Sequence, residues 1–558
     1  MRNRLRLHRK LVLVVAPLAL LTVGIVAVLV LQRQEGPFDT VICFGRVFDG
    51  DKMRPWGTCV AVKDGRVARI GWLELARAHH HLYAWGRVVS PGFIDVHTHV
   101  EANISSTRPF RALNFLEQGV TTIITGNCGT STLHTAALLA GLERNGTQVN
   151  VATLVGHNSI RTSVMGSSHQ SANSRDIASM MEIVEQNMRD GALGFSTGLA
   201  YAPGAFAQRD EVVELAKAAA SLGGLYVTHL RDEGVDGKAA LEEALDIGRA
   251  ASMPVHISHF KVASRSQWGQ AAERLVMLDK ERQAGRHITL DLYGYTASST
   301  STDILLPVEF RGARVSWKKT LDEASTRREL VGGMVDLLNR NGFPDYGYAR
   351  IAFFNPSREL NGKTVSEAAE LLGDRLPAWD VRIAHSHKVI PPADQIRTVL
   401  FLASRGGAQM VYFDMSQPDV ETIMRSPFAS FGTDSSVRSP ELATSHPRGT
   451  GNFPRVLGYF VRERNILSLT EALRKMTSLP ADTFGLMGRG RIREGDPADL
   501  VVFDPETIQA RSTYDKPLEP PIGIDLVMVN GGLAIEGDRA DKHNFGRALR
   551  RMPLLKSR

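Results

Sequence analysis

Short apolar runs and longer amphipathic stretches alternate through the middle of the chain, from about residue 89 to residue 488. Runs such as TTIITG, LYVTHL and PVHISHF have the composition of buried strands, and stretches such as RDEVVELAKAAASLG have helical periodicity. Strands that alternate with helices favour a parallel sheet, and repetition over this length predicts an α/β fold of the (β/α)8 TIM-like barrel type. A doubly wound sheet is the alternative, but no glycine-rich phosphate loop follows the first strand.

The two segments that flank this middle region have a different pattern of residues. Residues 36–88 and 489–540 contain short strands separated by turns such as Asp-Gly, and the two pieces together predict one small β-sandwich domain. Residues 300–378 interrupt the barrel rhythm with helices of their own, so we expect a lid-like insertion on a loop. Residues 541–558 are expected to form a basic tail.

The first 35 residues predict a basic leader and a transmembrane signal anchor. Residues 11–31 carry no charge, and at helical rise they extend about 31 Å, the thickness of a bilayer core. The basic leader is expected to stay in the cytoplasm, which places the catalytic domain on the extracytoplasmic side of a single-pass protein. A cleaved signal peptide is the alternative, but no small-x-small cleavage site precedes QRQEG.

Composition narrows the range of partners. The chain has 558 residues, a net charge of +7 and a pI near 9.3, yet its basic residues are scattered or lie at the two ends, and no nucleic-acid motif is present. We therefore expect no nucleic-acid partner, and the sequence carries no signal for an oligomeric state. Cys43 and Cys59 lie in predicted strands and form either a disulfide or two buried thiols.

Metal-binding side chains close several of the predicted barrel strands, where active sites of such barrels lie. His97 and His99 are two apart, so on a strand they face the same side. A lone histidine is more often a core or surface residue, but coincidence at several strand ends favours a metal centre, and imidazole with thiolate suits Zn²⁺. The candidate ligands are His97, His99, Cys128, His229 and His259.

A late strand ends in FGTDSS and offers Asp434. A carboxylate beside a zinc-activated water takes its proton and passes it to a leaving amine, so we expect Asp434 to be the proton shuttle. The alternative is a helix N-cap. Among the other histidines, His256 lies three before His259 and is expected to be structural. His385 and His387 are expected beside the site or at the surface.

His157 also ends a predicted strand and is a candidate to line the pocket.

These motifs resemble a known family. VVSPGFIDVHTH together with a two-part β domain resembles the amidohydrolase superfamily. TTIITGNCG, GALGFSTGLAYAPG, THLRDEG and HPRGTGNFPRVLGYFVRE are similar to the N-acyl-D-amino-acid deacylases (D-aminoacylases). The similarity runs from about Asp39 to Asp538 and is most specific where Cys128 occurs together with STGLAYAPG.

The resemblance implies a zinc-dependent hydrolase that converts N-acyl-D-amino acids to a carboxylic acid and a free D-amino acid. It implies one zinc ion held tightly by Cys128, His229 and His259, and a weaker second site that uses His97 and His99. It implies Asp434 as the catalytic acid and base. The positions expected around the substrate are Lys261, Tyr293, Ser299 and Arg448.

The sequence departs from the family in places, and other readings stay open. Val100 follows the His-x-His where the family commonly has an acidic residue, the segment after Asp434 is longer than expected, and the anchor is unusual. Another amidohydrolase, cleaving a dipeptide, a cyclic amide or a membrane-derived N-acyl amide, is one alternative. A second alternative is a membrane-tethered binding protein that has lost catalytic activity. Such a protein would be expected to have lost some of the candidate metal ligands, but all of them are present.

Overall fold

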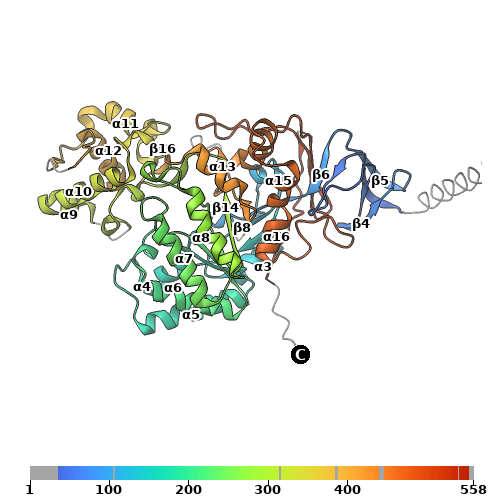
Figure 1. Ribbon diagram of the computed structural model, residues 1–558, viewed down its shortest axis with the longest axis horizontal. Coiled ribbons are helices and arrows are strands. Elements are labelled where there is room, and N and C mark those ends of the chain that lie inside the picture. Colours follow the sequence, from blue (N-terminus) through green and yellow to red (C-terminus); the bar gives the residue numbers. More distant parts are fainter. Residues whose placement is uncertain are drawn as a thin grey trace, which may run out of the picture.

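A computed structural model describes residues 36–104, 107–312, 316–383, 387–438, 445–537 and 539–551. The barrel forms the middle of the molecule, a β domain forms one end, and an insertion that carries helices α9 to α12 lies at the other end (Figure 1). The predicted anchor at residues 11–31 lies outside the described residues. Among those that are described, no helix is long and apolar enough to cross a membrane.

The barrel strands follow one another in chain order and pair in parallel. They are β7 (Phe93–Asp95), β8 (Val120–Thr125), β9 (Asn150–Thr153), β10 (Val155–Gly156), β11 (Gly194–Gly198), β12 (Leu225–His229), β13 (Val255–Ile257), β14 (Ile288–Leu292) and β18 (Ala429–Phe431). Because β9 and β10 are two halves of one strand interrupted at Leu154, the described residues form an eight-stranded barrel. A parallel bridge between Thr98 and Ser435 joins the first strand to the last.

Helices cover the outside of the barrel because each has one apolar face. In α6, for example, Val212, Leu215 and Ala219 are buried, whereas the remaining face is polar. The covering helices are α3 (Thr135–Asn145), α4 (His157–Met165), α5 (Ser174–Arg189), α6 (Arg209–Ser221), α7 (Gly237–Ala251), α8 (Ala271–Gln283), α13 (Gln417–Arg425), α15 (Leu469–Met476) and α16 (Ser478–Phe484). α14 (Arg448–Arg455) continues into a π-helical stretch over Val456–Glu463.

Both ends of the chain build the β domain. One sheet has the order β4-β3-β1-β5, with β1 (Phe38–Cys43), β3 (Cys59–Lys63), β4 (Arg66–Gly71) and β5 (Ala78–Tyr83). The other has the order β2-β6-β19-β20-β21-β22, with β2 (Arg46–Val47), β6 (Val88–Pro91), β19 (Leu500–Phe503), β20 (Ile524–Val529), β21 (Gly532–Glu536) and β22 (Arg539–Ala540). Ile42, Val60, Leu500 and Met528 share one apolar core, so neither end can form the domain alone.

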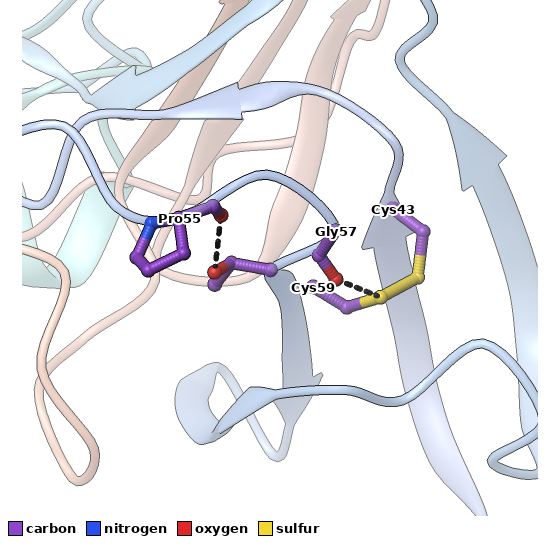
Figure 2. Close-up of a disulfide and its surroundings, with 5 residues drawn as sticks. Cys43, Pro55, Gly57 and Cys59 are labelled. Atoms are coloured by element: carbon purple, nitrogen blue, oxygen red, sulfur yellow. Dashed lines mark hydrogen bonds between the residues drawn. A yellow bond between two sulfur atoms is a disulfide. The ribbon is translucent and has the colours of Figure 1, made fainter.

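Cys43 and Cys59 form a disulfide that ties the end of β1 to the start of β3 (Figure 2). This decides between the two alternatives that the sequence left open. The described part of the predicted basic tail is also ordered against the barrel, because the backbone of Val151 accepts from Leu549 at 2.7 Å and donates to the carbonyl of Arg547 at 2.9 Å.

The insertion is longer than the expected residues 300–378. Its sheet has the order β15-β17-β16, with β15 (Ser298–Ser301), β16 (Ala349–Phe353) and β17 (Gln409–Tyr412). Its helices are α9 (Trp317–Asp322), α10 (Ala324–Asn341), α11 (Val365–Leu372) and α12 (Ala393–Ser404). The AQMVYF run has the composition of a barrel strand, but it is β17 and pairs antiparallel with both neighbours. A short apolar run has the same periodicity in either sheet, so the pattern alone misplaced it.

Candidate metal centre and active site

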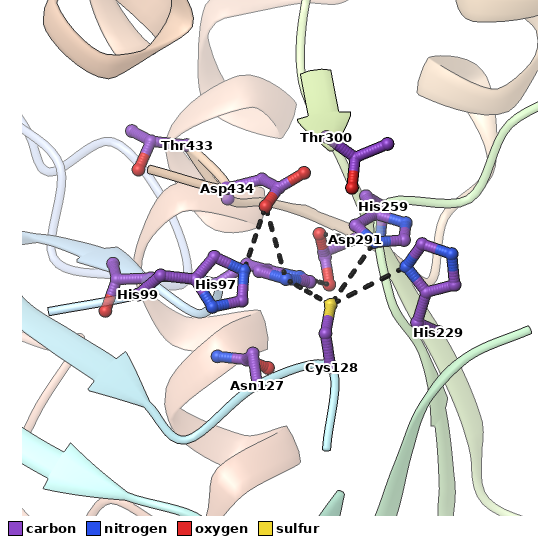
Figure 3. Close-up of polar contacts among 12 residues, drawn as sticks. His97, His99, Asn127, Cys128, His229, His259, Asp291, Thr300, Thr433 and Asp434 are labelled. Carbon is purple, nitrogen blue, oxygen red and sulfur yellow. Dashed lines mark hydrogen bonds and ion pairs between the residues drawn. The ribbon is translucent and has the colours of Figure 1, made fainter. Parts of the chain in front are cut away.

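Cys128 lies among three imidazoles at the mouth of the barrel (Figure 3). Its Sγ is 3.3 Å from His97 Nε2, 3.5 Å from His259 Nε2 and 3.7 Å from His229 Nδ1. The four side chains come from the ends of β7, β8, β12 and β13, and all four are buried. We call them the cysteine group. A thiolate and several imidazole nitrogens facing one another form the donor set that zinc prefers, so these residues fit the predicted ion.

The surroundings of Cys128 favour a thiolate. Burial by itself raises the pKa of its thiol, but the charges of His97 and His259 and hydrogen bonds from His229 and His259 lower that pKa well below the usual value. A metal ligand must be deprotonated before it binds, so the site is prepared for a cation.

Asp434 forms a second cluster with two of the histidines. Its Oδ1 lies 3.1 Å from His99 Nε2 and 3.6 Å from His97 Nε2, and its Oδ2 lies 2.8 Å from Arg448 Nη2. We call His97, His99 and Asp434 the aspartate group. Burial raises the pKa of Asp434, but Arg448 and the two histidines outweigh it and hold the pKa well below the usual range. The carboxylate is therefore ionised and directed at the imidazoles, which favours the shuttle position over a helix cap.

Glu233 supports the cysteine group from behind, and the sequence reasoning missed it. Its Oε1 lies 3.0 Å from His259 Nδ1 and 2.6 Å from Lys261 Nζ, and its Oε2 lies 3.5 Å from His229 Nε2. Burial raises the pKa of Glu233, but Lys261, His229 and His259 outweigh this and lower it. A carboxylate on the outer nitrogen of an imidazole fixes the orientation of the ring. The available signal was its place four residues after His229 in THLRDEG.

Asp291 on β14 has the same role for His97. Its Oδ2 lies 3.3 Å from His97 Nδ1 and 3.0 Å from His256 Nε2, and its Oδ1 accepts from the backbone N–H of His259 at 3.0 Å. The other nitrogen of His256 lies 2.8 Å from Thr289 Oγ1. His256 is therefore a buried support for Asp291, in agreement with its expected structural role.

Three site residues have left-handed backbone. Cys128 has φ 51°, His259 has φ 32° and Asp434 has φ 46°. Such conformations cost of order 1 kcal/mol or more for a residue with a Cβ, and they persist where the surroundings over-determine them. Each of the three lies two or three residues after the end of a barrel strand, so the turn is what directs its side chain into the mouth.

Two cavities meet at the candidate metal ligands. The larger, of about 510 Å³, is lined by Arg448, by hydroxyl-bearing residues and by Phe353 and Gln409 of the insertion. The smaller, of about 130 Å³, is lined by Lys261, by Tyr293 and by aromatic residues of the insertion. The residues that face both are Tyr201, His259, Ser299, Thr300 and Asp434. The insertion thus forms part of the wall of each cavity.

The expected substrate residues all line these cavities, but they differ in what they already contact. Arg448 pairs with Asp434, and its Nε and Nη1 are buried without a partner among the described residues. Lys261 is engaged by Glu233 and lies 2.8 Å from His259 Nδ1. The Tyr293 ring lies 4.5 Å from the Arg448 guanidinium. Ser299 Oγ donates to a backbone carbonyl of the insertion at 2.8 Å.

Other candidates lie away from the mouth. His157, which had been expected to line the pocket, is buried and lines neither cavity, with Nε2 2.8 Å from Glu211 Oε1. His387 pairs with Asp336 on the insertion at 2.9 Å, and His385 lies outside the described residues. The residues of the larger cavity that were missed include Tyr201 in STGLAYAPG and Arg438 in the longer segment after Asp434.

Comparison with known proteins places the chain. A family model described as "Amidohydrolase family" matches residues 84–534. The chain belongs to this amidohydrolase family. The amidohydrolase is 32% identical over 543 residues to the D-aminoacylase of Alcaligenes xylosoxydans xylosoxydans, covering 93% of this chain and 99% of the relative. It is 33% identical to the N-acyl-D-glutamate deacylase of the same organism, covering 92% and 96%.

Solved structures agree with this placement within the deacylases. The amidohydrolase superposes on the N-acyl-D-glutamate deacylase of Bordetella bronchiseptica, solved with zinc and a phosphonate mimic of the tetrahedral intermediate, with a TM-score of 0.76 and 30% identity. A D-aminoacylase structure concerned with its binuclear metal centre gives a TM-score of 0.75 and 31% identity. Each match covers 92% of this chain and 100% of the other. The protein is therefore a hydrolase of the amidohydrolase type with the D-aminoacylase fold.

Proposed function

We propose that this amidohydrolase removes the acyl group from N-acyl-D-amino acids and releases a carboxylate and a free D-amino acid. The observation that carries the proposal is the placement of Asp434 beside the cysteine group, at the junction of two cavities that can receive the two sides of an amide. The D configuration rests on the two deacylase relatives, each at least 32% identical over nearly the whole chain.

Cys128, His229 and His259 would hold one zinc ion tightly, and His97, His99 and Asp434 would form a weaker second site. The chemistry that a zinc ion supplies in such a site is polarisation of the amide carbonyl and acidification of a water molecule. The donor types, their burial and the lowered pKa of the Cys128 thiol support this assignment. So does the zinc in the related deacylase structure.

The protein's own residues then divide the remaining work. Asp434 is ionised, so it can accept the proton of the attacking water at a carboxylate oxygen and return it to the leaving nitrogen. Arg448 holds Asp434 in place, and its two unpartnered N–H groups remain for the substrate carboxylate. Lys261 is held against Glu233, so its charge supports the imidazoles more directly than it serves a substrate.

The proposal also places the catalytic domain outside the cytoplasm, attached to a membrane through residues 11–31. The uncharged run supports attachment. The disulfide between Cys43 and Cys59 supports an oxidising compartment, because such bonds are rare in the cytosol. A protein in that position meets membrane-derived N-acyl amides, which are the second substrate class to test.

The test is amine release from paired N-acetyl-D- and N-acetyl-L-amino acids by the full chain in detergent with zinc, with Cys128→Ala as the control. Release from the D series alone, lost in the variant, is the expected result. Release from the L series alone would contradict the proposed substrate. If neither series reacts while zinc remains bound, dipeptides and membrane-derived N-acyl amides replace it as candidates.

A further inference from the structure

Five aromatic side chains gather at one end of the β domain and line neither of the two cavities at the candidate active site. We call Phe44, Trp56, Trp72, Tyr83 and Trp85 the aromatic surface. Trp56 is 65% exposed, Trp72 62%, Tyr83 61% and Trp85 55%, and among the other described large hydrophobic residues only Met487 and Val276 are more than half exposed. Three of the six tryptophans of the chain thus lie within 30 residues and face solvent.

The rings form one cluster. The Phe44 and Trp85 rings stack at 4.0 Å, Phe44 lies 5.7 Å from Tyr83, and Trp56 lies 6.2 Å from Trp85. Trp72 lies over Gly57, where an added Cβ would come within 3.0 Å of the indole. Isolated exposed apolar residues need no explanation, whereas a contiguous exposed patch marks an interaction site.

The local fold maintains this exposure. β1 and β5 run parallel with Cys43 opposite Tyr83, and β3 pairs with β4 so that Cys59 lies opposite Gly71, which brings the flanking turns to one end of the sheet. The disulfide joins two of these turns (Figure 2). Phe44 directly follows it with φ 63°, an outlier for a bulky residue. The chain thus adopts a strained conformation that carries the Phe44 ring onto Trp85, on the surface.

The chemistry of the cluster fits a lipid headgroup layer. Trp and Tyr are enriched where membrane proteins meet the bilayer surface, because each has an apolar ring and a polar group. Trp268 on the barrel donates its indole N–H to Asp414 O at 2.9 Å. None of the described residues accepts a hydrogen bond from the indole N–H of Trp56, Trp72 or Trp85, so these groups are available to headgroups.

The closeness of the aromatic surface to residues 11–31 along the chain indicates what this surface contacts. The uncharged run ends at Leu31, and the described residues begin at Gly36, so the linker between them reaches at most about 18 Å. The aromatic surface lies at the Cys43 end of β1, opposite Phe38, and this six-residue strand is about 20 Å long, close to the full reach of the linker. We propose that the aromatic surface lies in the headgroup layer of the bilayer to which residues 11–31 attach the protein. This inference rests on the membrane attachment proposed above, and not on the substrate.

The test uses the full chain reconstituted into phosphatidylcholine–phosphatidylglycerol vesicles, with and without brominated acyl chains that quench nearby tryptophans. The probe variant is W56S/W72S/W85S, and the control variant is W268F, which changes an exposed tryptophan of the barrel. Because three of the six tryptophans of the chain belong to the aromatic surface, about half of the wild-type tryptophan emission should be quenched. The W268F protein should keep this quenching, and the triple variant should lose it.

Carbonate extraction of the vesicles measures attachment separately. Extraction-resistant protein without quenching would overturn the aromatic proposal alone, and protein released by carbonate would overturn the attachment first. Quenching that persists in the triple variant would also overturn the proposal. So would tryptophan protection by a soluble glycan, or a detergent-stable dimer that the triple substitution dissociates. The zinc content and the thermal midpoint of the triple variant should match the wild type, which excludes misfolding as the cause of a loss.

Discussion

The cysteine group and the aspartate group share His97 yet differ in what surrounds them. The cysteine group is buried, and its imidazoles are held by two carboxylates, Glu233 and Asp291. In the aspartate group the side chain of His99 is 32% exposed, and Asp434 is paired with a cation, Arg448. Like charges repel strongly in a partly dehydrated site, so Arg448 competes with any metal ion for Asp434. Under the proposed function, the first group would hold an ion tightly, and the second would bind a metal only weakly and keep its carboxylate available for proton transfer.

Removing the thiolate should break this comparison most severely. Cys128→Ala deletes the atom that three imidazoles face, so we expect activity to fall by on the order of 10³-fold or more and the tightly bound zinc to be lost. Mass spectrometry and turnover rates measure the two effects. The matched control is Cys43→Ser with Cys59→Ser, which should leave the zinc stoichiometry unchanged. A Cys128→Ala protein with full zinc content would show that the sulfur is not a ligand.

Asp434→Asn separates proton transfer from metal binding. We expect kcat to fall by about 10²- to 10⁴-fold, because the amide cannot accept the proton, while the zinc in the cysteine group remains. Turnover and zinc content are measured on the same sample. Loss of that zinc together with activity would mean that the two groups form a single binding unit.

Arg448→Gln sharpens the comparison in the opposite direction. Without the competing guanidinium, the aspartate group should bind a second metal ion at least about tenfold more tightly, whereas KM for an N-acyl amino acid should rise. Titration of the one-zinc protein with a second equivalent, followed calorimetrically, measures the first effect. Unchanged affinity for the second ion would show that Arg448 does not weaken that site.

Substitution of Asp414 should have the smallest effect, and it extends the comparison to the pH dependence of stability. It faces the smaller cavity together with Asp434, but burial raises its pKa to about 6, and no arginine compensates. The pKa of Asp414 is higher in the folded protein than its unfolded value of 3.8. The contribution of this carboxyl group to stability is therefore fully present below pH 3.8 and is lost as the pH rises through 6. At pH 7.5 Asp414→Asn should therefore melt about 2 °C higher than the wild type, and this advantage should shrink toward pH 4. A pH-independent difference would contradict this explanation.

The sequence predicted the parts of the molecule that depend on local pattern. Strand ends and the His-x-His spacing placed His97, His99 and Cys128 together, because the ends of parallel strands meet at one rim. Glu233 and Asp291 were missed because their role depends on imidazoles contributed by other strands. The insertion was assigned too early an end because β17 finds its partners only in space. The disulfide stayed open because spacing alone does not show that two strands are neighbours.

The bridge between Thr98 and Ser435 has a consequence for the order of assembly. The backbone N–H of Asp434 donates to His97 O, and that of His99 donates to Ser435 O, each at 2.8 Å. The cysteine group comes from the ends of β7, β8, β12 and β13, which all precede the insertion, whereas Asp434 follows the insertion in the chain. The proposed zinc ligands can therefore gather while the barrel is still open, but the proposed proton shuttle reaches them only when the last strand pairs with the first. The protein would therefore hydrolyse its substrate only after the barrel has closed.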